Sequence, residues 1–211
     1  MLLISSSGIL QNDAFGDSTG NFAVLASTYT NTAAGTFISG DIGYTTGPKV
    51  VPTISGSTHV ADSAYSKAGI AQNIAISSAK SQTCTTNLGT TVNLSLVNGG
   101  VYTPGVYCTT GAASIGTNGI TLSGNGIYIF KINGALTTVS KSNVMLTNGA
   151  QASDVSWVPT QATTLGANSN FAGTILDASG VTIGNGASVT GKVLAFGGTV
   201  STGPSVRINA L

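Results

Sequence analysis

Side chains capable of acid–base or nucleophilic catalysis are few in this 211-residue chain. His59 is the single histidine, and its place three residues before Asp62 favours a histidine held at a helix start over a general base. Asp154 and Asp177 are candidates for the two carboxyl groups that glycoside hydrolysis places across the scissile bond. Both lie on neighbouring rungs of a face that we expect to be covered, where they are badly placed for catalysis. We therefore predict no catalytic residue, and a polysaccharide-cleaving enzyme stays as an alternative.

The composition excludes several other classes of function. Only 6% of the residues are charged, the six acids are all aspartates, and the net charge is +1 with the cations scattered singly. Nucleic-acid binding needs a cluster of cations on one surface, and no apolar run approaches the ~18 residues of a membrane span. One histidine does not support a usual zinc site, and nucleotide-binding glycine motifs are absent. We expect no metal, no cofactor, no nucleic acid and no membrane partner.

The chain has two cysteines, Cys84 and Cys108. An even pair in a chain rich in threonine and poor in charge favours a disulfide and an oxidising compartment. The alternative is a pair of buried free thiols.

A short hydroxyl-containing motif recurs through the second half of the chain. SIGTN begins at Ser114, TLGAN at Thr164 and TIGNG at Thr182, and Thr164, Thr182 and Thr199 follow one another after 18 and 17 residues. Earlier repeats are longer, so their loops must bulge. Short β segments recurring at such a period indicate a three-sided parallel β-helix, in which each coil contributes one strand to each face.

The first face of this solenoid is apolar on both sides of each strand. A strand buried on both sides has this pattern, so another element must cover the face. The only helical pattern runs over about 57–80, where alanines recur every three or four residues. We expect one helix of about 20 residues along the face, with Ser57 or Thr58 as its N-cap and Asp62 in its first turn. The strands of the first face are expected at Val106–Thr109, Ile127–Ile132, Val155–Pro159, Thr174–Asp177 and Lys192–Phe196.

The second face alternates between apolar and small polar residues. Ile115, Leu165, Ile183 and Val200 are expected to point inward, leaving a column of hydroxyl residues outside. The Leu136–Val139 rung fits less well, because it turns Thr138 inward and Val139 outward. The candidate surface residues of this face are Ser114, Gly116, Thr137, Val139, Thr164, Gly166, Thr182, Gly184, Thr199 and Ser201.

The third face is more mixed and carries Met145 and Arg207 outside. It is a possible second binding surface, through Thr121, Ser123, Asn170, Ala172, Ser188 and Thr190. The asparagines expected at the coil corners, where a left-handed backbone is needed, are Asn118, Asn148, Asn168 and Asn185.

The uncharged column on the second face predicts a specific kind of ligand. Exposed sheets ordinarily carry charges, whereas this column avoids them. Adjacent rungs lie about 4.8 Å apart and outward residues i and i+2 about 6.6 Å apart, which makes a rigid grid close to the oxygen spacings of ice. Threonine adds a hydroxyl that joins a water network and a methyl that water must cage. We expect such a surface to order water into an ice-like layer.

Longer stretches of the chain resemble the microbial ice-binding proteins of cold-adapted bacteria, diatoms and fungi. The resemblance runs through the segments GNFAVLAS (20–27), ISGDIG (38–43), TPGVY (103–107), IYIFKINGALTT (127–138), NVMLTNGAQASDVSWV (143–158) and TTLGANSNFAGTILDASGVTIGNGASVTGKVLA (163–195). It implies a discontinuous three-sided β-helix flanked by one long helix, with the N-terminal strands in the same solenoid. It also implies that a relatively flat face binds ice, without fixing which residues do so.

Residues and resemblance together predict a secreted, monomeric ice-binding protein that inhibits ice growth and recrystallisation. We expect a tail or capping segment over 1–19 and one β-helix domain over 20–211. A carbohydrate-binding or adhesin module is the alternative. Such a module would want exposed aromatic platforms for sugars, and the single tryptophan falls on the covered face.

Overall fold

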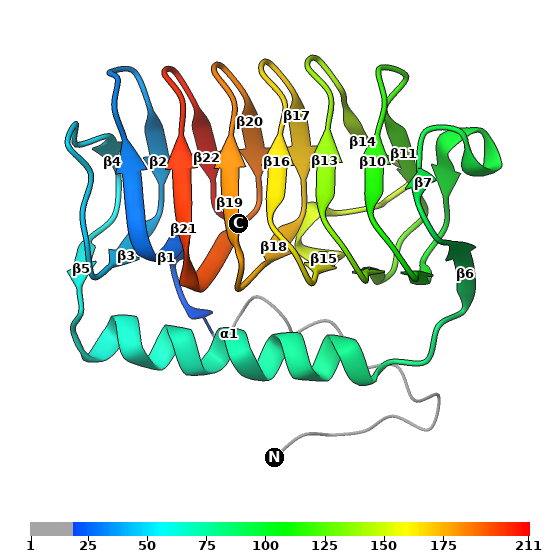
Figure 1. Cartoon of the computed structure of the whole chain (residues 1–211), viewed down its shortest axis with the longest axis horizontal. Coiled ribbons are helices and arrows are strands. Elements are labelled where there is room, and N and C mark those ends of the chain that lie inside the picture. The colour runs from blue at the N-terminus through cyan, green and yellow to red at the C-terminus, as the bar shows by residue number, and fades with distance from the viewer. Residues whose placement is uncertain (1–18) are drawn as a thin grey trace.

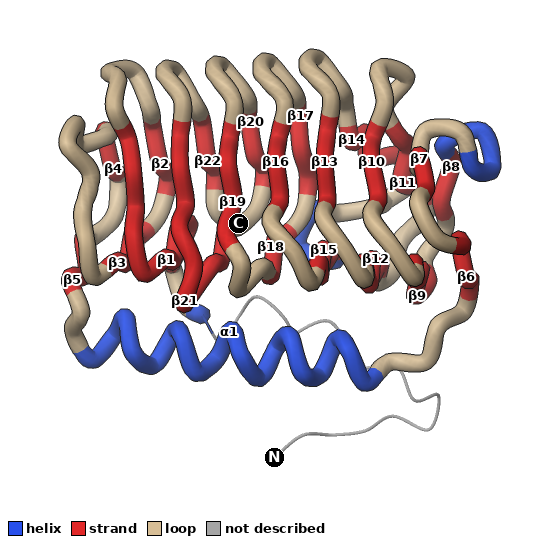
Figure 2. Tube along the Cα trace, in the orientation of Figure 1, coloured by secondary structure: helices blue, strands red, loops and turns tan. Residues whose placement is uncertain are grey.

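The computed structural model describes residues 19–211, which form a three-faced solenoid of parallel strands with one long helix beside it (Figures 1 and 2). The predicted three-sided parallel β-helix with a flanking helix is thus confirmed. Most of the tail expected over 1–19 lies outside the described residues.

Three stacks of strands make the three faces. The helix-covered face consists, in stacking order, of β6 (Thr86–Gly89), β9 (Gly105–Thr109), β12 (Tyr128–Ile132), β15 (Val155–Pro159), β18 (Thr174–Leu176), the first part of β21 (Val193–Thr202), the first part of β1 (Phe22–Asn31), β3 (Asp41–Tyr44) and β5 (Thr58–Val60). The hydroxyl face consists of β7 (Val92–Asn93), β10 (Ala113–Ile115), β13 (Leu136–Thr138), β16 (Thr163–Leu165), β19 (Gly180–Ile183) and the second parts of β21 and β1. The third face consists of two separate sheets, β8 (Val101–Tyr102), β11 (Ile120–Ser123) and β14 (Val144–Thr147), then β17 (Asn170–Ala172), β20 (Ser188–Thr190), β22 (Arg207–Asn209), β2 (Phe37–Ser39) and β4 (Thr53–Ile54).

The order of coils in space differs from their order in the chain, as the resemblance implied. The N-terminal strand β1 lies beside β21, with Val24 opposite Val193, and β2 lies beside β22, with Phe37 opposite Arg207. The chain then leaves by β5, runs back along the solenoid as the helix, and starts the far end with β6 (Figure 1). The first and last segments of the described chain are therefore neighbours within one sheet.

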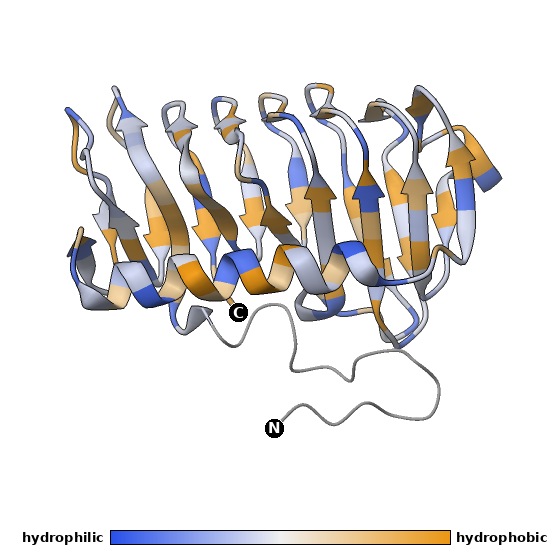
Figure 3. Cartoon of the chain, turned by 60° about the horizontal axis from the view of Figure 1, so that its bottom comes forward, coloured by the Kyte–Doolittle hydropathy of each residue, from blue (hydrophilic) through white to orange (hydrophobic). Residues whose placement is uncertain are grey.

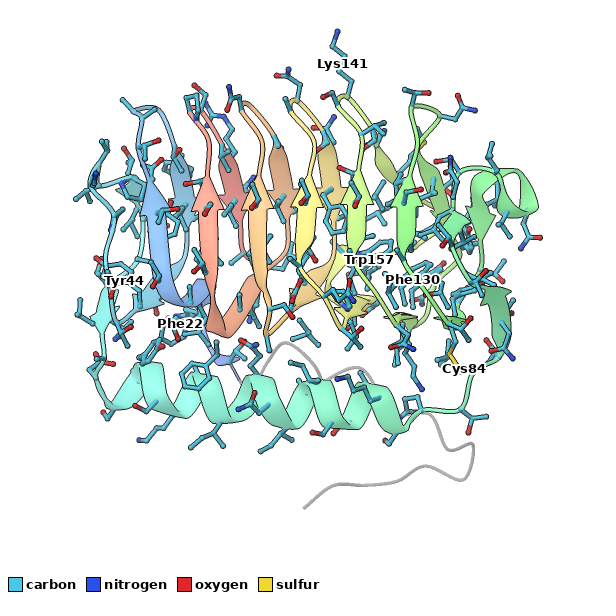
Figure 4. All side chains as sticks on the ribbon, viewed as in Figure 1. Phe22, Tyr44, Cys84, Phe130, Lys141 and Trp157 are labelled. Carbon is cyan, nitrogen blue, oxygen red and sulfur yellow. A yellow bond between two sulfur atoms is a disulfide. The ribbon has the colours of Figure 1, made fainter. Side chains whose placement is uncertain are left out.

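Stacked aromatic rings fill part of the interior. Tyr107 lies 5.2 Å from Phe130, Phe130 lies 4.1 Å from Trp157, and Trp157 lies 5.0 Å from Phe171, measured between ring centroids. The Trp157 indole N–H donates to the carbonyl of Ala172 at 2.9 Å, so its one polar group is satisfied inside the core. Phe130 and Trp157 lie between the faces in Figure 4.

Helix α1 spans Ser63–Ser81, and its start differs from the prediction. Thr58, expected as the N-cap, instead begins β5, which pairs with β3. Asp62 is the N-cap, and its carboxylate accepts from the N–H of Tyr65 at 2.8 Å. Residues 57–60 contain no proline or glycine, so the sequence offers no signal that ends the predicted helix there. Pairing with β3 gives their backbone groups partners, which a helix would otherwise have to supply.

The alanine stripe of α1 packs against the sheet, as predicted. The side of the sheet that faces α1 carries a second apolar cluster, separate from the interior core. This cluster includes Leu25, Ile129, Val158 and Leu194. Figure 3 shows the helix lying along the strands, with apolar segments on both. The buried residues of α1 are Tyr65, Ala68, Gly69, Ala71, Gln72, Ala75 and Ala79.

The C-terminal end of α1 is fastened to the solenoid in two ways. The Lys131 ammonium donates to the carbonyls of Lys80 and Gln82, each at 2.7 Å. Close by, Cys84 and Cys108 form the predicted disulfide. The bridge joins the segment after the helix to β9 and closes a loop with a sequence separation of 24.

The prediction that asparagines take the left-handed backbone at the coil corners is correct for only some of them. Asn148 and Asn168 are left-handed, with φ of 51° and 55°, whereas at Asn118 and Asn185 the following glycine takes the positive φ instead. Lys141 occupies a left-handed corner with φ of 62°, and its side chain projects from the crest of its loop in Figure 4. Glycine next to asparagine offers the backbone a lower-strain site for the same turn, which sequence reasoning on asparagine alone does not resolve.

Replacing Lys141 by glycine should stabilise the fold. A non-glycine residue in the left-handed region destabilises the folded state by about 1–2 kcal/mol, and glycine avoids this cost. Glycine also raises the conformational entropy of the unfolded chain, which offsets part of the gain. We expect Lys141→Gly to gain about 0.5–1 kcal/mol, a rise of about 1–4 °C in Tm followed by circular dichroism. Lys141→Ala removes the same charge but keeps a Cβ, and should not gain. Equal shifts in both variants would assign the effect to charge.

Removing the disulfide should destabilise the protein without changing its architecture. A closed loop of this length is worth about 3 kcal/mol, which corresponds to about 6–12 °C in Tm. We expect this shift both on reduction of the unsubstituted protein and in the double variant Cys84→Ala/Cys108→Ala. The double variant should be insensitive to reductant. An unchanged melting temperature in both samples would contradict the prediction.

Candidate functional site

One straight column of small polar side chains runs along the hydroxyl face. The strand register places each member directly beside the next through seven rungs. We call this the hydroxyl column, and its members in stacking order are Asn93, Ser114, Thr137, Thr164, Thr182, Ser201 and Thr30. Thr137, Thr164 and Thr182 are exposed and the other four are half-buried. None of the seven is charged.

The register corrects the expected place of Thr199. Its repeat spacing suggested that Thr199 stacks on Thr182, whereas Ser201 pairs with Thr182, and Thr199 pairs with Gly180. The reason lies in the corner that leads into the face. Three residues separate the paired positions Leu176 and Gly180, whereas four separate their partners Leu194 and Thr199. Because β21 has one residue more in this corner, Ser201 lies beside Thr182.

The inward residues keep the column in phase. Ile115, Leu165, Ile183 and Val200 are each at most 1% exposed, as predicted. Thr138 also points inward and is 3% exposed, and its hydroxyl accepts from the N–H of Gly166 at 2.9 Å. The buried hydroxyl thus has a partner, so this rung keeps Thr137 outside like its neighbours.

Beside the hydroxyl column, two positions further along each strand, lies a row of mostly small residues, which we call the trough. Packing explains why Gly166 stands there: a Cβ on it would lie 2.4 Å from the carbonyl carbon of Val139 in the neighbouring coil. Val139 is 39% exposed and is the one large side chain of the trough. The trough residues are Gly116, Val139, Gly166, Gly184 and Gly203.

The hydroxyls of the column differ in their hydrogen-bond partners. The Thr30 hydroxyl donates to the Ser201 hydroxyl at 2.7 Å, and the Ser114 hydroxyl donates to the carbonyl of Val92 at 3.3 Å. Within residues 19–211, the hydroxyls of Thr137, Thr164 and Thr182 have no hydrogen-bond partner in the protein. These three are open to water on a backbone that the rungs hold in place.

Sequence reasoning missed the contribution of the N-terminal strand. β1 continues the face beyond β21, with Thr28 beside Thr199 and Thr30 beside Ser201, and an isolated bridge brings Thr46 beside Thr28. The alternation in Ser27–Asn31, with a buried Tyr29 between two threonines, was a usable signal. Only the spatial order of the coils shows that it belongs to this face.

The third face is a poorer surface for a regular ligand. Ala172, expected to be outward, is 5% exposed because the core closes around it. The column through Asn170 and Ser188 continues with Arg207 and Phe37, which are a cation and a ring. Thr190 is exposed, whereas Thr121 and Ser123 are half-buried, and Ser123 accepts from the Asn148 amide at 2.8 Å. The face is also split between two sheets.

The two candidate catalytic carboxylates are both buried. Asp177 is fully buried, and its carboxylate accepts from the Thr163 hydroxyl at 2.7 Å and from the N–H groups of Ser179 and Gly180. Burial raises the pKa of Asp177, and these hydrogen bonds oppose the rise. Asp154 is 6% exposed; its Oδ1 accepts from the Ser153 hydroxyl at 3.4 Å, whereas its buried Oδ2 has no hydrogen-bond partner within residues 19–211. Asp177 therefore holds a corner of the solenoid, and neither carboxylate is exposed on a face.

His59 is held at the helix start, as expected. Its Nδ1 lies 2.8 Å from the Asp62 carboxylate, and its Nε2 lies 3.7 Å from that of Asp41. Hydrogen bonds from the Tyr65 N–H and from His59 lower the pKa of Asp62. In residues 19–211 no group of three or more His, Cys, Asp or Glu side chains is placed to share a metal ion. Over the same range, no helix has both the length and the apolar character needed to cross a bilayer.

Comparison with known proteins places this geometry in a family. The model of the family described as "Ice-binding-like" matches residues 23–205. An ice-binding protein of Nostoc sp. (strain HG1) is 30% identical over 200 residues, covering 90% of this chain and 72% of the relative. The ice-binding protein of Flavobacterium frigoris (strain PS1) is 37% identical over 101 residues. That alignment covers 47% of this chain and only 36% of the relative, so the chain spans about a third of that protein.

Solved structures agree with the family match. The crystal structure of an ice-binding protein from the Antarctic ascomycete Antarctomyces psychrotrophicus has a TM-score of 0.83 at 26% identity, covering 92% of this chain and 97% of the other. An ice-binding protein from an Antarctic biological consortium has a TM-score of 0.81 at 26% identity, covering 93% and 90% of the two chains. The chain therefore belongs to the ice-binding-like family.

Proposed function

We propose that the protein adsorbs to ice through the hydroxyl face and thereby inhibits ice growth and recrystallisation. The observation that carries this proposal is the hydroxyl column, which continues through seven rungs without a charge. Membership of the ice-binding-like family supports it independently.

The chemistry of the face suits ordered water. Rungs about 4.8 Å apart hold the hydroxyls at a fixed pitch, and the backbone ladder prevents them from following disordered water. The open hydroxyls of Thr137, Thr164 and Thr182 can take places in a water network, while their methyl groups and the trough leave water few other partners. Because charged groups are absent from the column, no strong hydration shell has to be removed.

Many weak contacts make adsorption long-lived. Each hydroxyl contributes little, but a rigid column engages all its members at once, so detachment requires breaking them together. Ice that grows between adsorbed molecules must then bulge outward. The curved surface has a lower freezing point, and growth stops without any catalytic step.

The proposal also includes the location and the oligomeric state of the protein, which we take to be secreted and monomeric. The Cys84–Cys108 disulfide suits an oxidising compartment, which supports a secreted protein. One chain carries the whole face, so a monomer is sufficient. A sugar-binding role has no support here, because Trp157 is fully buried and offers no platform.

Bulky substitutions in the middle of the hydroxyl column should abolish most of the activity. Thr164→Tyr or Thr182→Tyr places a ring above the plane and separates the neighbouring rungs from ice, while the exposed site leaves the core intact. We expect loss of most of the thermal hysteresis, measured by nanolitre osmometry, with an unchanged melting temperature.

Thr190→Tyr is the matched control, since Thr190 is an exposed threonine on β20 of the third face, in the same coil as Thr182. It should keep nearly full activity. Full hysteresis in both column variants, or equal loss in the control, would refute the hydroxyl face as the binding surface.

Crystal habit gives a direct test of adsorption by the unsubstituted protein. A single ice crystal held just below its melting point in the protein solution should grow facets, because adsorbed molecules slow particular planes. A smooth disc at the same concentration would contradict ice binding itself.

A further inference from the structure

The hydroxyl face is not uniform along its length. The residues two positions before the hydroxyl column form a neighbouring column, whose composition changes midway. It begins with Thr91 before β7, contains only alanine and glycine at β10, β13, β16 and β19, and contains only threonine from β21 onward. Its members in stacking order are Thr91, Ala112, Ala135, Ala162, Gly180, Thr199, Thr28 and Thr46.

At the β21–β1 end, hydroxyls therefore repeat in two directions. Thr199 and Ser201 lie on one strand, and Thr28 and Thr30 lie beside them on the next. We call these four residues the hydroxyl grid. Its members are about 4.8 Å apart across strands and about 6.6 Å apart along them. Toward the other end, over β10, β13, β16 and β19, a single line of hydroxyls has alanine or glycine on one side and the trough on the other.

Side-chain hydrogen bonds hold the strand pair of the grid on both its outer and its inner side. The Thr30 hydroxyl donates to Ser201 across the two strands at 2.7 Å, which fixes both rotamers. The inward residue between Thr28 and Thr30, Tyr29, is fully buried, and its hydroxyl lies 2.8 Å from that of Thr202. A buried hydroxyl contact between Tyr29 and Thr202 therefore joins the two strands of the grid on their inner side.

A line and a grid select ice planes differently. A line of hydroxyls fits every plane that contains one row of matching spacing, whereas a grid fits only planes that match in both directions at once. Specificity is a difference of affinities, so the part of the surface with the stricter requirement decides between planes. The remaining line adds contacts to whichever plane the grid accepts.

We propose that the hydroxyl grid of Thr28, Thr30, Thr199 and Ser201 determines which ice planes the protein binds, while the single-line end supplies adhesion without selecting the plane. This inference rests on the proposed function, and it assigns a specificity role to the N-terminal strand β1.

The test compares two double variants that each remove two hydroxyls and keep side-chain shape. Thr28→Val/Thr199→Val turns one row of the grid apolar, and Thr137→Val/Thr164→Val does the same within the single line. Each protein carries a fluorescent label and is frozen into a single-crystal ice hemisphere, where the labelled planes are read directly. Circular dichroism melts check that both variants fold.

We expect the grid variant to lose or change labelled planes relative to the unsubstituted protein. The line variant should keep the same planes with weaker labelling. A plane pattern that is unchanged in the grid variant, or altered equally in both variants, would overturn the inference and leave ice binding intact. No labelled ice with the unsubstituted protein would overturn the proposed function together with the inference.

A gain-of-contact variant keeps the test decisive even if the grid variant folds poorly. Ala135→Thr/Ala162→Thr adds two threonines to the neighbouring column at β13 and β16, separated from Thr199 by Gly180, without touching β1 or β21. We expect stronger labelling of the same planes and greater hysteresis. Labelling of new planes would show that the single-line end can select planes, against the inference.

Discussion

The parallel backbone ladder is the constraint on which the rest of the structure depends. Each coil donates and accepts hydrogen bonds with the next, so the rungs repeat at a fixed pitch of about 4.8 Å and every side chain sits above its counterpart. A column such as Thr137, Thr164 and Thr182 is straight because its backbone is straight. The backbone hydrogen bonds set the spacing of the column, and the side chains set its chemistry.

Covering one face leaves another free to meet a ligand. The helix-covered face is apolar on both sides, and α1 can lie against it because alanine and glycine let the helix approach. The Gln72 amide oxygen accepts from the N–H of Phe196 at 2.8 Å, which ties the helix to β21. The disulfide and Lys131 fasten the far end of the helix. These contacts hold the helix against one face of the solenoid and leave the hydroxyl face uncovered.

Corners decide which residues of a face line up. The hydroxyl pattern of β21 contains hydroxyl residues at both Thr199 and Ser201, so either could continue the column on sequence grounds. One additional residue between the helix-covered part and the hydroxyl-face part of β21 places Ser201 beside Thr182 and Thr199 beside Gly180. The length of this corner is a weak sequence signal with a large effect, since a change of one residue alters which side chains of the strand point outward.

The sequence alone determined the repeat, the apolar inner residues, the covering helix, the cysteine pairing and the absence of charge from the hydroxyl column. All of these follow from local periodicity and composition, which each segment carries by itself. Only the tertiary structure decided that β1 lies beside β21, that Thr28 and Thr30 join the face, that Asp62 rather than Ser57 or Thr58 caps α1, and that Ala172 is buried. These depend on pairings between segments far apart in the chain. Backbone hydrogen bonding is nearly independent of side-chain type, so no local pattern specifies which strand will be the partner.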